Sequence, residues 1–412
     1  MSARERSDVA ADASADSVAD SSAKRLADAN EPKEMTPEQL AEAKRYGRVS
    51  LQLDLADRAI DLVFLGVFAL LVARPLDAWL IGSAGLTAWW WRLVAMFLIQ
   101  TLAHLAVSFP LSFYSGHVVE HRFGLSRQTA FGWLTRYAKR HALTLGLGLV
   151  MIEGLWGIIY WTGGYWWLAA AGASFLVSVL LGRIVPTVIL PLFYDVERLE
   201  DEPLLNRLNR RAEGTGLAVE GVYRLGLSAE TAKANAMLAG LGRTRRVLLG
   251  DTLIDRFSPE EIEVVFAHEV GHHVHRHIPK LMALGLIGSA AGFAAVHGGL
   301  VAWFAALGEP LIFTPLPVSA VPLFSLLLLL LGMVAEPLMN ALSRFHEVQA
   351  DTYALDVTEN PAAFCSAFRK LAAQNKADPN PPWLEVVWFH DHPPIAARIA
   401  LAERTRAGGE GA

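Results

Sequence analysis

Residues 267–277 read AHEVGHHVHRH, and an apolar stretch long enough to cross a bilayer follows at 281–306. Five histidines and one glutamate therefore stand directly before a membrane segment. Upstream, residues 258–261 (SPEE) combine an N-cap serine, a proline at the first helical position and a capping box. We expect a helix to begin there and to carry the histidines, with Ile262, Val265 and Phe266 on its apolar face.

His268, Glu269 and His272 form the pattern H-E-x-x-H. Four residues advance an α-helix by roughly 400°, so the two histidines lie one turn apart on the same face and can bind one ion. Zinc accepts two neutral imidazoles and a carboxylate and leaves a fourth position for water. Glu269 can take a proton from that water. A surface helix rich in histidine is the alternative that the motif alone leaves open.

The other three histidines of the stretch are expected to form a polar helix end where it meets the membrane. His275 lies on the same stripe as the pair, but about 10 Å beyond His268 along the helix axis. No glycine follows His272 to turn the chain back, as it does in metzincins. His273 and His277 are expected to point to other faces.

A third metal ligand is expected in residues 343–351 (SRFHEVQAD). Glu347 and Asp351 stand four residues apart on a predicted helix, so both can face one site. Glu347 would bind zinc, and Asp351 would hydrogen-bond a ligand imidazole from behind. A solvated acidic helix face is the alternative. The two motifs flank one predicted membrane hairpin and should therefore emerge at the same surface.

The composition indicates a membrane protein: 53% of the residues are hydrophobic and 19% are charged. Stretches long enough to span a bilayer lie near 60–82, 88–110, 142–161, 166–188, 281–306 and 318–340. A seventh span around 186–194 stays open because prolines interrupt it. The single cysteine, Cys365, excludes internal disulfides and an all-cysteine metal site. The net charge of −5 argues against a nucleic-acid partner.

Charge and aromatic residues predict the orientation. Lysines and arginines precede the first span and fill the loop at 111–141, whereas tryptophans gather at the opposite face. The positive-inside rule then places the large soluble segments and the metal site on the cytoplasmic side. The residues concerned are Lys44, Arg45, Arg48, Arg122, Arg127, Arg136, Lys139 and Arg140, and on the other face Trp89, Trp90, Trp91, Trp161, Trp166 and Trp167.

The chain divides into soluble and membrane parts. We expect a disordered tail and a short leading helix capped at Thr36 in 1–50, and an N-terminal transmembrane region in 51–190. Residues 191–279 form the first soluble part, 280–340 a transmembrane hairpin and 341–412 the second soluble part. Within the first soluble part, 233–238 and 246–249 flank a GLG turn and predict a short β-hairpin.

These motifs together resemble the integral-membrane zinc peptidases that comprise type I CAAX prenyl endopeptidases and HtpX-like proteases. Further similar segments are PLSFYSGHVVEHRFGLSRQT (110–129), PLFYDVERLEDEPL (191–204), AKANAMLAGLGRTRRVLLGDTLI (232–254) and HPPIAARI (392–399). The first and last of these are closer to the prenyl endopeptidase branch. The resemblance implies a mainly α fold: a polytopic helical bundle enclosing a chamber, with a cytoplasmic zincin-type (gluzincin) protease domain.

The resemblance also implies roles for single residues. His268, His272 and Glu347 would bind one Zn²⁺ per chain, and Glu269 would be the general base. Asn235 and Ala236 match an edge strand that pairs with an extended substrate, as β-augmentation allows. His392 would steady the oxyanion or the bound peptide, with Arg398 nearby as a substrate-binding residue. Alternatively, His392 and the two prolines after it only start the last helix.

The expected activity is that of a membrane-embedded zinc endopeptidase that hydrolyses peptide bonds with a metal-activated water. Its partners would be the lipid bilayer and a peptide or protein substrate, including a lipidated or membrane-associated one, with no nucleic acid. One alternative is an HtpX-like quality-control protease without prenyl specificity. A more distant one is a non-catalytic scaffold or transporter, whose structural metal would need a fourth protein ligand.

Overall fold

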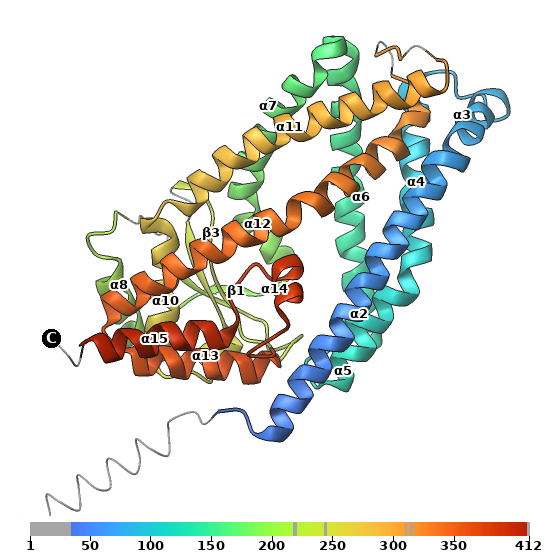
Figure 1. The fold of residues 1–412 in the computed structure, drawn as a ribbon. Coiled ribbons are helices and arrows are strands. Elements are labelled where there is room, and N and C mark those ends of the chain that lie inside the picture. Colours follow the sequence, from blue (N-terminus) through green and yellow to red (C-terminus); the bar gives the residue numbers. More distant parts are fainter. Residues whose placement is uncertain (1–33, 217–220, 243–244, 310, 314–315, 410–412) are drawn as a thin grey trace, which may run out of the picture.

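A computed structural model describes residues 34–216, 221–242, 245–309, 311–313 and 316–409. The disorder expected for the N-terminal tail concerns residues outside this part of the chain. Long apolar helices form one end of the molecule, and a small sheet with shorter helices forms the other (Figure 1). The long helices are α2 (Pro37–Val67), α4 (Trp89–Phe113), α6 (Ala130–Thr162), α7 (Trp166–Ile184), α11 (His277–Ala306) and α12 (Val321–Thr358), and the shorter α3 (Ala73–Gly82) continues α2. The one-turn α5 (Glu120–Arg122) follows α4.

Within the described residues, five continuous helical segments are long and apolar enough to cross a membrane. They are Pro37–Gly82, Trp89–Arg122, Ala130–Leu192, His277–Ala306 and Val318–Thr358. The third contains two of the six predicted stretches, 142–161 and 166–188. The chain turns between α6 and α7 at Gly163, which has a φ of +56°, and the helical segment continues through the turn. Its last part, where a seventh span was considered, forms a π-helical segment (Val185–Ile189) and a 3₁₀ turn (Leu190–Leu192).

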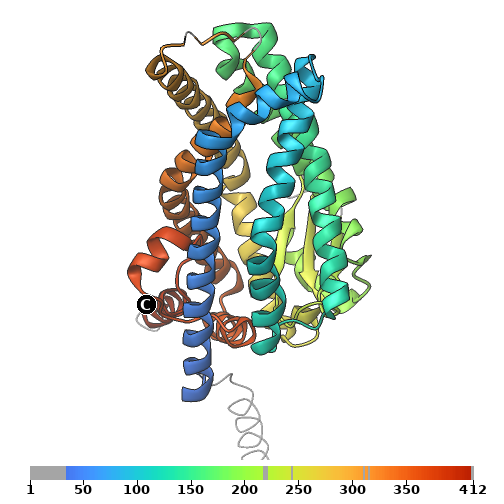
Figure 2. The same ribbon diagram turned by 90° about the vertical axis from the view of Figure 1, so that its right-hand side faces the viewer.

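The membrane helices run from the sheet to the opposite end and back. The connections α3–α4, α6–α7 and α11–α12 all lie at the end remote from the sheet (Figure 1). Figure 2 shows α2, α4 and α6 side by side on one flank. Helices α11 and α12 form the hairpin that leaves the soluble part and returns to it. The expected domain boundaries at 50 and 340 fall inside α2 and α12, so each of these helices belongs to both regions.

The soluble part contains one described sheet in the order β1-β2-β4-β3. Its strands are β1 (Val196–Arg198), β2 (Gly221–Leu225), β3 (Ala236–Ala239) and β4 (Arg246–Gly250). The predicted hairpin is confirmed, because β3 and β4 pair antiparallel with Leu238 opposite Val247. The sequence did not predict β1 and β2, which are short and pair across distant segments. Strand β3 is left at the edge of the sheet.

The helices of the soluble part are α8 (Glu202–Ala212), α9 (Asp251–Ile254), α10 (Pro259–Val274), α13 (Pro361–Asn375), α14 (Trp383–Phe389) and α15 (Ile395–Gly409). The capping box at the start of α10 is confirmed: the Ser258 hydroxyl accepts from the Glu261 amide, and the Glu261 carboxylate accepts from the Ser258 amide. Ile262, Val265 and Phe266 are buried against the sheet, as predicted.

Helix α10 is buried on two sides. Opposite its sheet-facing residues, Val264 and Ala267 pack against α12 and α13, where Ala354 and Phe364 are also buried. At the crossing of α10 and α12 there is no room for a side chain at Gly271. A Cβ atom there would lie 3.0 Å from Cα and 3.2 Å from the carbonyl oxygen of Ala350. The two helix backbones are therefore in direct contact beside the H-E-x-x-H motif.

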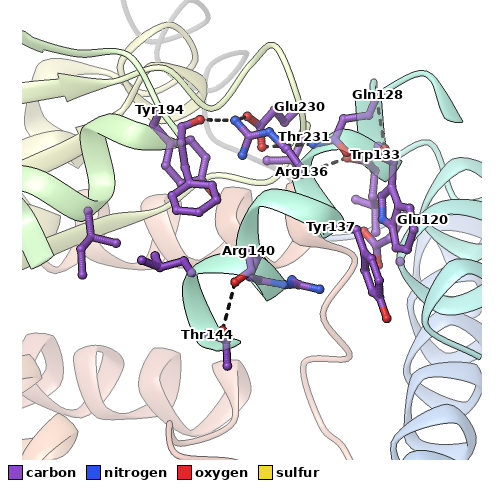
Figure 3. Close-up of a pocket in the computed structure, with 16 residues that line it drawn as sticks. Glu120, Gln128, Trp133, Arg136, Tyr137, Arg140, Thr144, Tyr194, Glu230 and Thr231 are labelled. Atoms are coloured by element: carbon purple, nitrogen blue, oxygen red, sulfur yellow. Dashed lines mark hydrogen bonds and ion pairs between the residues drawn. The ribbon is translucent and has the colours of Figure 1, made fainter. Parts of the chain in front are cut away.

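A second junction joins the base of the membrane helices to the sheet. There Arg136 of α6 forms an ion pair with Glu230, and its guanidinium lies 4.9 Å from the ring centroid of Tyr194 (Figure 3). Gln128 donates to Glu230 at 3.1 Å. The cavity beside these residues has a volume of about 550 Å³. This junction and the α10–α12 crossing fix the soluble part against the bundle.

Gly271→Ala tests the crossing. Alanine normally favours a helix over glycine by up to ~1 kcal/mol, but here its Cβ would overlap the α12 backbone. We expect a net loss of about 1–3 kcal/mol in unfolding free energy. Thermal unfolding in detergent would measure it. In the matched control Gly285→Ala on α11, the new Cβ has no neighbour within 4 Å. Equal melting temperatures for both variants would contradict the close crossing.

Candidate metal centre

Three side chains with metal-binding donor atoms converge where α10 crosses α12. Nε2 of His268 lies 3.2 Å from Nε2 of His272 and 3.2 Å from Oε2 of Glu347. Nε2 of His272 lies 3.2 Å from Oε1 of the same glutamate. Ligands at the usual zinc distances of about 2.0–2.1 Å in a tetrahedron are separated by about 3.3 Å. Among the described residues, His268, His272 and Glu347 are the group whose potential ligand atoms lie close enough together to hold one metal ion.

The hydrogen bonds behind the two imidazoles show that this site fits a cation. Nδ1 of His268 lies 2.9 Å from the Asp351 carboxylate, which only accepts hydrogen bonds, so Nδ1 of a neutral His268 carries the proton. Its Nε2 lone pair then faces the Glu347 carboxylate. Burial opposes a charge on His268, but the hydrogen bonds to Asp351 and Glu347 outweigh burial and raise the pKa of the imidazole to about 9. The surroundings therefore favour positive charge at Nε2.

Asp351 is itself held by Arg398. The guanidinium donates through Nε to Oδ2 of Asp351 at 2.8 Å, and both side chains are buried. Arg398 also lies over the ring of Phe368, with 3.8 Å between its Cζ and the ring centroid. Asp351 is thus placed behind His268, in the position that the spacing predicts. The substrate-binding role expected for Arg398 stays a prediction; its guanidinium also lies 3.3 Å from Nδ1 of His268 and 3.7 Å from Oε2 of Glu347.

The imidazole of His272 contacts a residue, His277, whose position was predicted wrongly from the sequence. His277 was expected at a polar helix end, but it is 1% exposed, and its Nδ1 lies 2.9 Å from Nδ1 of His272. Its Nε2 lies 3.0 Å from Oε1 of Gln349 on α12. The chain returns because Arg276 adopts a left-handed conformation, with φ of +55°, between α10 and α11. A non-glycine residue makes this turn, so the sequence carries little signal for it.

Glu269 lies beside the edge strand of the sheet. Its Oε2 accepts a hydrogen bond of 2.9 Å from the amide of Leu238 in β3. Ala236 lies in the same strand and Asn235 directly precedes it. The Asn375 side chain pairs with both the amide and the carbonyl of Ala234, at 2.8 and 3.1 Å. Because Asn375 already occupies the backbone of Ala234, the part of the strand edge beside Glu269 begins with Asn235 and Ala236. These are the two residues that the sequence analysis named.

His392 approaches the same centre from the segment before α15. Its Nε2 lies 3.5 Å from Oε2 of Glu347, and its Nδ1 lies 2.7 Å from Oδ1 of Asp391. The hydrogen bond to Asp391 is the main cause that raises the pKa of His392. More than half of the His392 side chain is exposed, so it can contact a bound molecule. Asp391 was not singled out from the sequence, because an acidic neighbour gives no distinctive pattern.

A cavity of about 360 Å³ opens onto these groups. Its polar lining includes His268, Glu269 and His392, and its apolar lining includes Leu253, Val265, Phe368 and Leu371. The cavity therefore joins the candidate base to an apolar recess between α10 and α13. Such a recess suits an uncharged side chain next to the reacting bond.

Two family models cover most of the chain. Residues 22–195 match the model described as CAAX prenyl protease N-terminal, five membrane helices, and residues 198–406 match Peptidase family M48. An uncharacterized metalloprotease, YhfN, of Bacillus subtilis is 27% identical over 90% of this chain and 87% of its own. The CAAX prenyl protease 1 of Saccharomyces cerevisiae is 28% identical over 74% of this chain and 70% of its own.

The fold is also found in a solved structure. The crystal structure of S. mikatae Ste24p superposes with a TM-score of 0.76 at 24% sequence identity, and the match covers 90% of this chain and 92% of that chain. The likeness extends over both the membrane helices and the soluble part. It confirms the predicted polytopic bundle with a protease-type domain.

Replacing His277 by phenylalanine tests whether it positions His272. Phenylalanine keeps a ring but removes the acceptor of the His272 Nδ1–H bond. Groups behind metal-binding histidines are typically worth about 10–100-fold in metal affinity, and we expect a loss of that size. Chelator competition would measure zinc affinity. His275→Phe is the matched control, because no described hydrogen bond joins its ring to a candidate ligand. Unchanged affinity in a folded His277→Phe protein would contradict the positioning role.

Proposed function

The chain belongs to peptidase family M48 and is an integral-membrane metalloprotease, and we propose that His268, His272 and Glu347 hold one zinc ion while Glu269 is the general base. One observation carries this proposal: the Nε2 atoms of His268 and His272 lie 3.2 Å apart, and each lies 3.2 Å from one of the two carboxylate oxygens of Glu347. A zinc ion at this place would lower the pKa of a bound water and polarise the scissile carbonyl.

Glu269 and His392 have different roles in the proposed reaction. Glu269 takes the proton of the attacking water and passes it to the departing amine. Its carboxylate is aligned by the Leu238 amide, which leaves Oε1 for the water. His392 faces the centre on the side of Glu347 and can donate a hydrogen bond to the oxyanion that forms on the carbonyl. Asp391 favours the protonated imidazole that this donation requires.

An extended peptide fits the free edge of β3. In antiparallel pairing, the amide and carbonyl of Ala236 would bond to the substrate backbone and set its register. One side chain of the substrate would then enter the apolar recess near Val265 and Leu371. The scissile bond would lie between Glu269 and His392. The arrangement supports roles for Asn235 and Ala236 in peptide alignment.

The substrate class is proposed from the relatives. Several are named CAAX prenyl protease 1 or a homolog of it, and from these names we infer that this chain cleaves peptides that carry a prenyl group. The positive residues beside the first span support a cytoplasmic site. The family match favours an enzyme over a scaffold or transporter, and no described feature favours a quality-control protease without prenyl specificity.

Glu269→Gln tests the general base. The amide cannot take a proton from water, whereas the three proposed ligands are unchanged. We expect zinc content to stay at one ion per chain and peptide hydrolysis to fall by at least about 100-fold, within the range typical of lost general base catalysis. Metal analysis and a fluorogenic peptide assay on the same preparation would measure both. Retained turnover would contradict the role of Glu269.

Two peptides that differ only in a farnesyl group on one cysteine test the substrate class. If the enzyme recognises the lipid, kcat/KM should be far higher for the farnesylated peptide at equal detergent concentration. Glu269→Gln supplies the background rate for each peptide. Equal cleavage of the two would contradict prenyl specificity and would favour quality-control proteolysis, while leaving the metal site assignment intact.

A further inference from the structure

Helix α14, with the sequence WLEVVWF, exposes apolar side chains. Trp383 is 71% exposed, Leu384 53% and Trp388 45%, whereas Glu385, the acidic residue of the helix, is turned inward beside His390. A helix at the surface of a water-soluble domain normally turns its charged residues outward. Here the arrangement is reversed, which is typical of a surface that contacts an apolar partner.

The position of α14 is fixed by the ends of two membrane spans. Asn340 on α12 donates to the carbonyl of Trp388 at 2.9 Å, and Arg344, one turn on, donates to the carbonyl of Val386 at 2.8 Å. On the other side, Arg58 of α2 lies over the ring of Phe389, 4.7 Å from its centroid. The apolar stretch 318–340 ends at Asn340, and the stretch 60–82 begins two residues after Arg58. Helix α14 therefore lies at the level where both spans enter the bilayer.

The exposed face of α14 continues the lipid-facing surface of α12. In Figure 2, α14 is the short orange-red helix at the left, and it projects outward beside α12 and α2. On α12, Leu338 is 72% exposed and Phe345 58% exposed, on the two sides of Asn340. Tryptophan prefers the boundary between the headgroups and the acyl chains. Exposed apolar side chains therefore lie on α12 on both sides of Asn340 and on the adjoining α14.

We propose that α14 is an interfacial membrane helix, with Trp383, Leu384 and Trp388 inserted among the lipid headgroups and upper acyl chains. Its inward face, with Glu385 and Phe389, stays on the protein. The short length of the helix suits this role, since it has to cover only the boundary layer and not to cross the bilayer.

This placement brings the bilayer to the rim of the metal centre. The chain runs from α14 through His390 and Asp391 directly to His392, which faces Glu347. Behind α14, a cavity of about 360 Å³ is lined by Tyr46, Asp54, Phe389 and His392. If the proposed function holds, a peptide attached to a lipid in the same leaflet would meet the site without leaving the surface. The membrane placement of α14 does not depend on that function.

Spin-label accessibility in nanodiscs tests the proposal. The full chain would carry Cys365→Ala, since Cys365 is buried and not needed for labelling, together with Leu384→Cys and a nitroxide label. Oxygen concentrates in the bilayer, whereas a water-soluble nickel chelate is excluded from it. Two matched controls carry the label on α12 at Leu338→Cys and on α15 at Glu403→Cys, whose side chain is 61% exposed.

We expect the label at 384 to collide with oxygen and to have little accessibility to the nickel chelate. In this it should resemble the label at 338 and differ from the label at 403. Accessibility to nickel at 384 equal to that at 403 would overturn the proposal, because the helix would then face water. A single symmetric peak in size-exclusion chromatography, as for the unlabelled protein, shows that each labelled protein is folded without relying on the proposed zinc site. Since the readout uses no substrate, failure here would leave the proposed peptidase activity untouched.

Discussion

The direct contact between α10 and α12 at Gly271 and Ala350 is the constraint on which the site depends. Without a side chain at Gly271, the two backbones approach closely enough for donors on both helices to meet at 3.2 Å. Helix α10 supplies two imidazoles one turn apart, and α12 supplies the carboxylate. A single methyl group at the crossing would separate them. The geometry of the proposed metal site therefore depends on the close packing of α10 against α12.

The same crossing connects the site to the membrane. Helix α12 is continuous from Val321 to Thr358, so Glu347 and Asp351 are carried on the extension of a span. His277, at the start of the other span of the hairpin, supports His272, while Asp351 supports His268. Each imidazole is thus oriented by a residue from the hairpin. A tilt of α11 against α12 would therefore change the geometry of the proposed metal centre, so this centre depends on how the two helices of the hairpin pack.

The parts of the fold and site that could be predicted are those with local signals. Capping residues predicted the start of α10, the period of the helix paired His268 with His272, and the spacing of Glu347 and Asp351 placed both on one face. The parts that could not be predicted depend on distant contacts or on a backbone conformation that the residue type does not indicate. His277 reaches His272 only because Arg276, a non-glycine residue, adopts a left-handed conformation. Strand β1 has only three residues, β2 lacks the turn that joins β3 to β4, and no pattern indicates that the Leu238 amide meets Glu269.

The central claim is that α12 completes on α10 a metal centre of two histidines and one distant glutamate. X-ray absorption at the zinc edge of the purified protein, compared with Glu347→Ala, tests it most directly. We predict one zinc ion per chain with only nitrogen and oxygen neighbours, including two imidazoles, and loss of stoichiometric zinc in the variant. Full zinc occupancy with an unchanged spectrum in Glu347→Ala would contradict the claim.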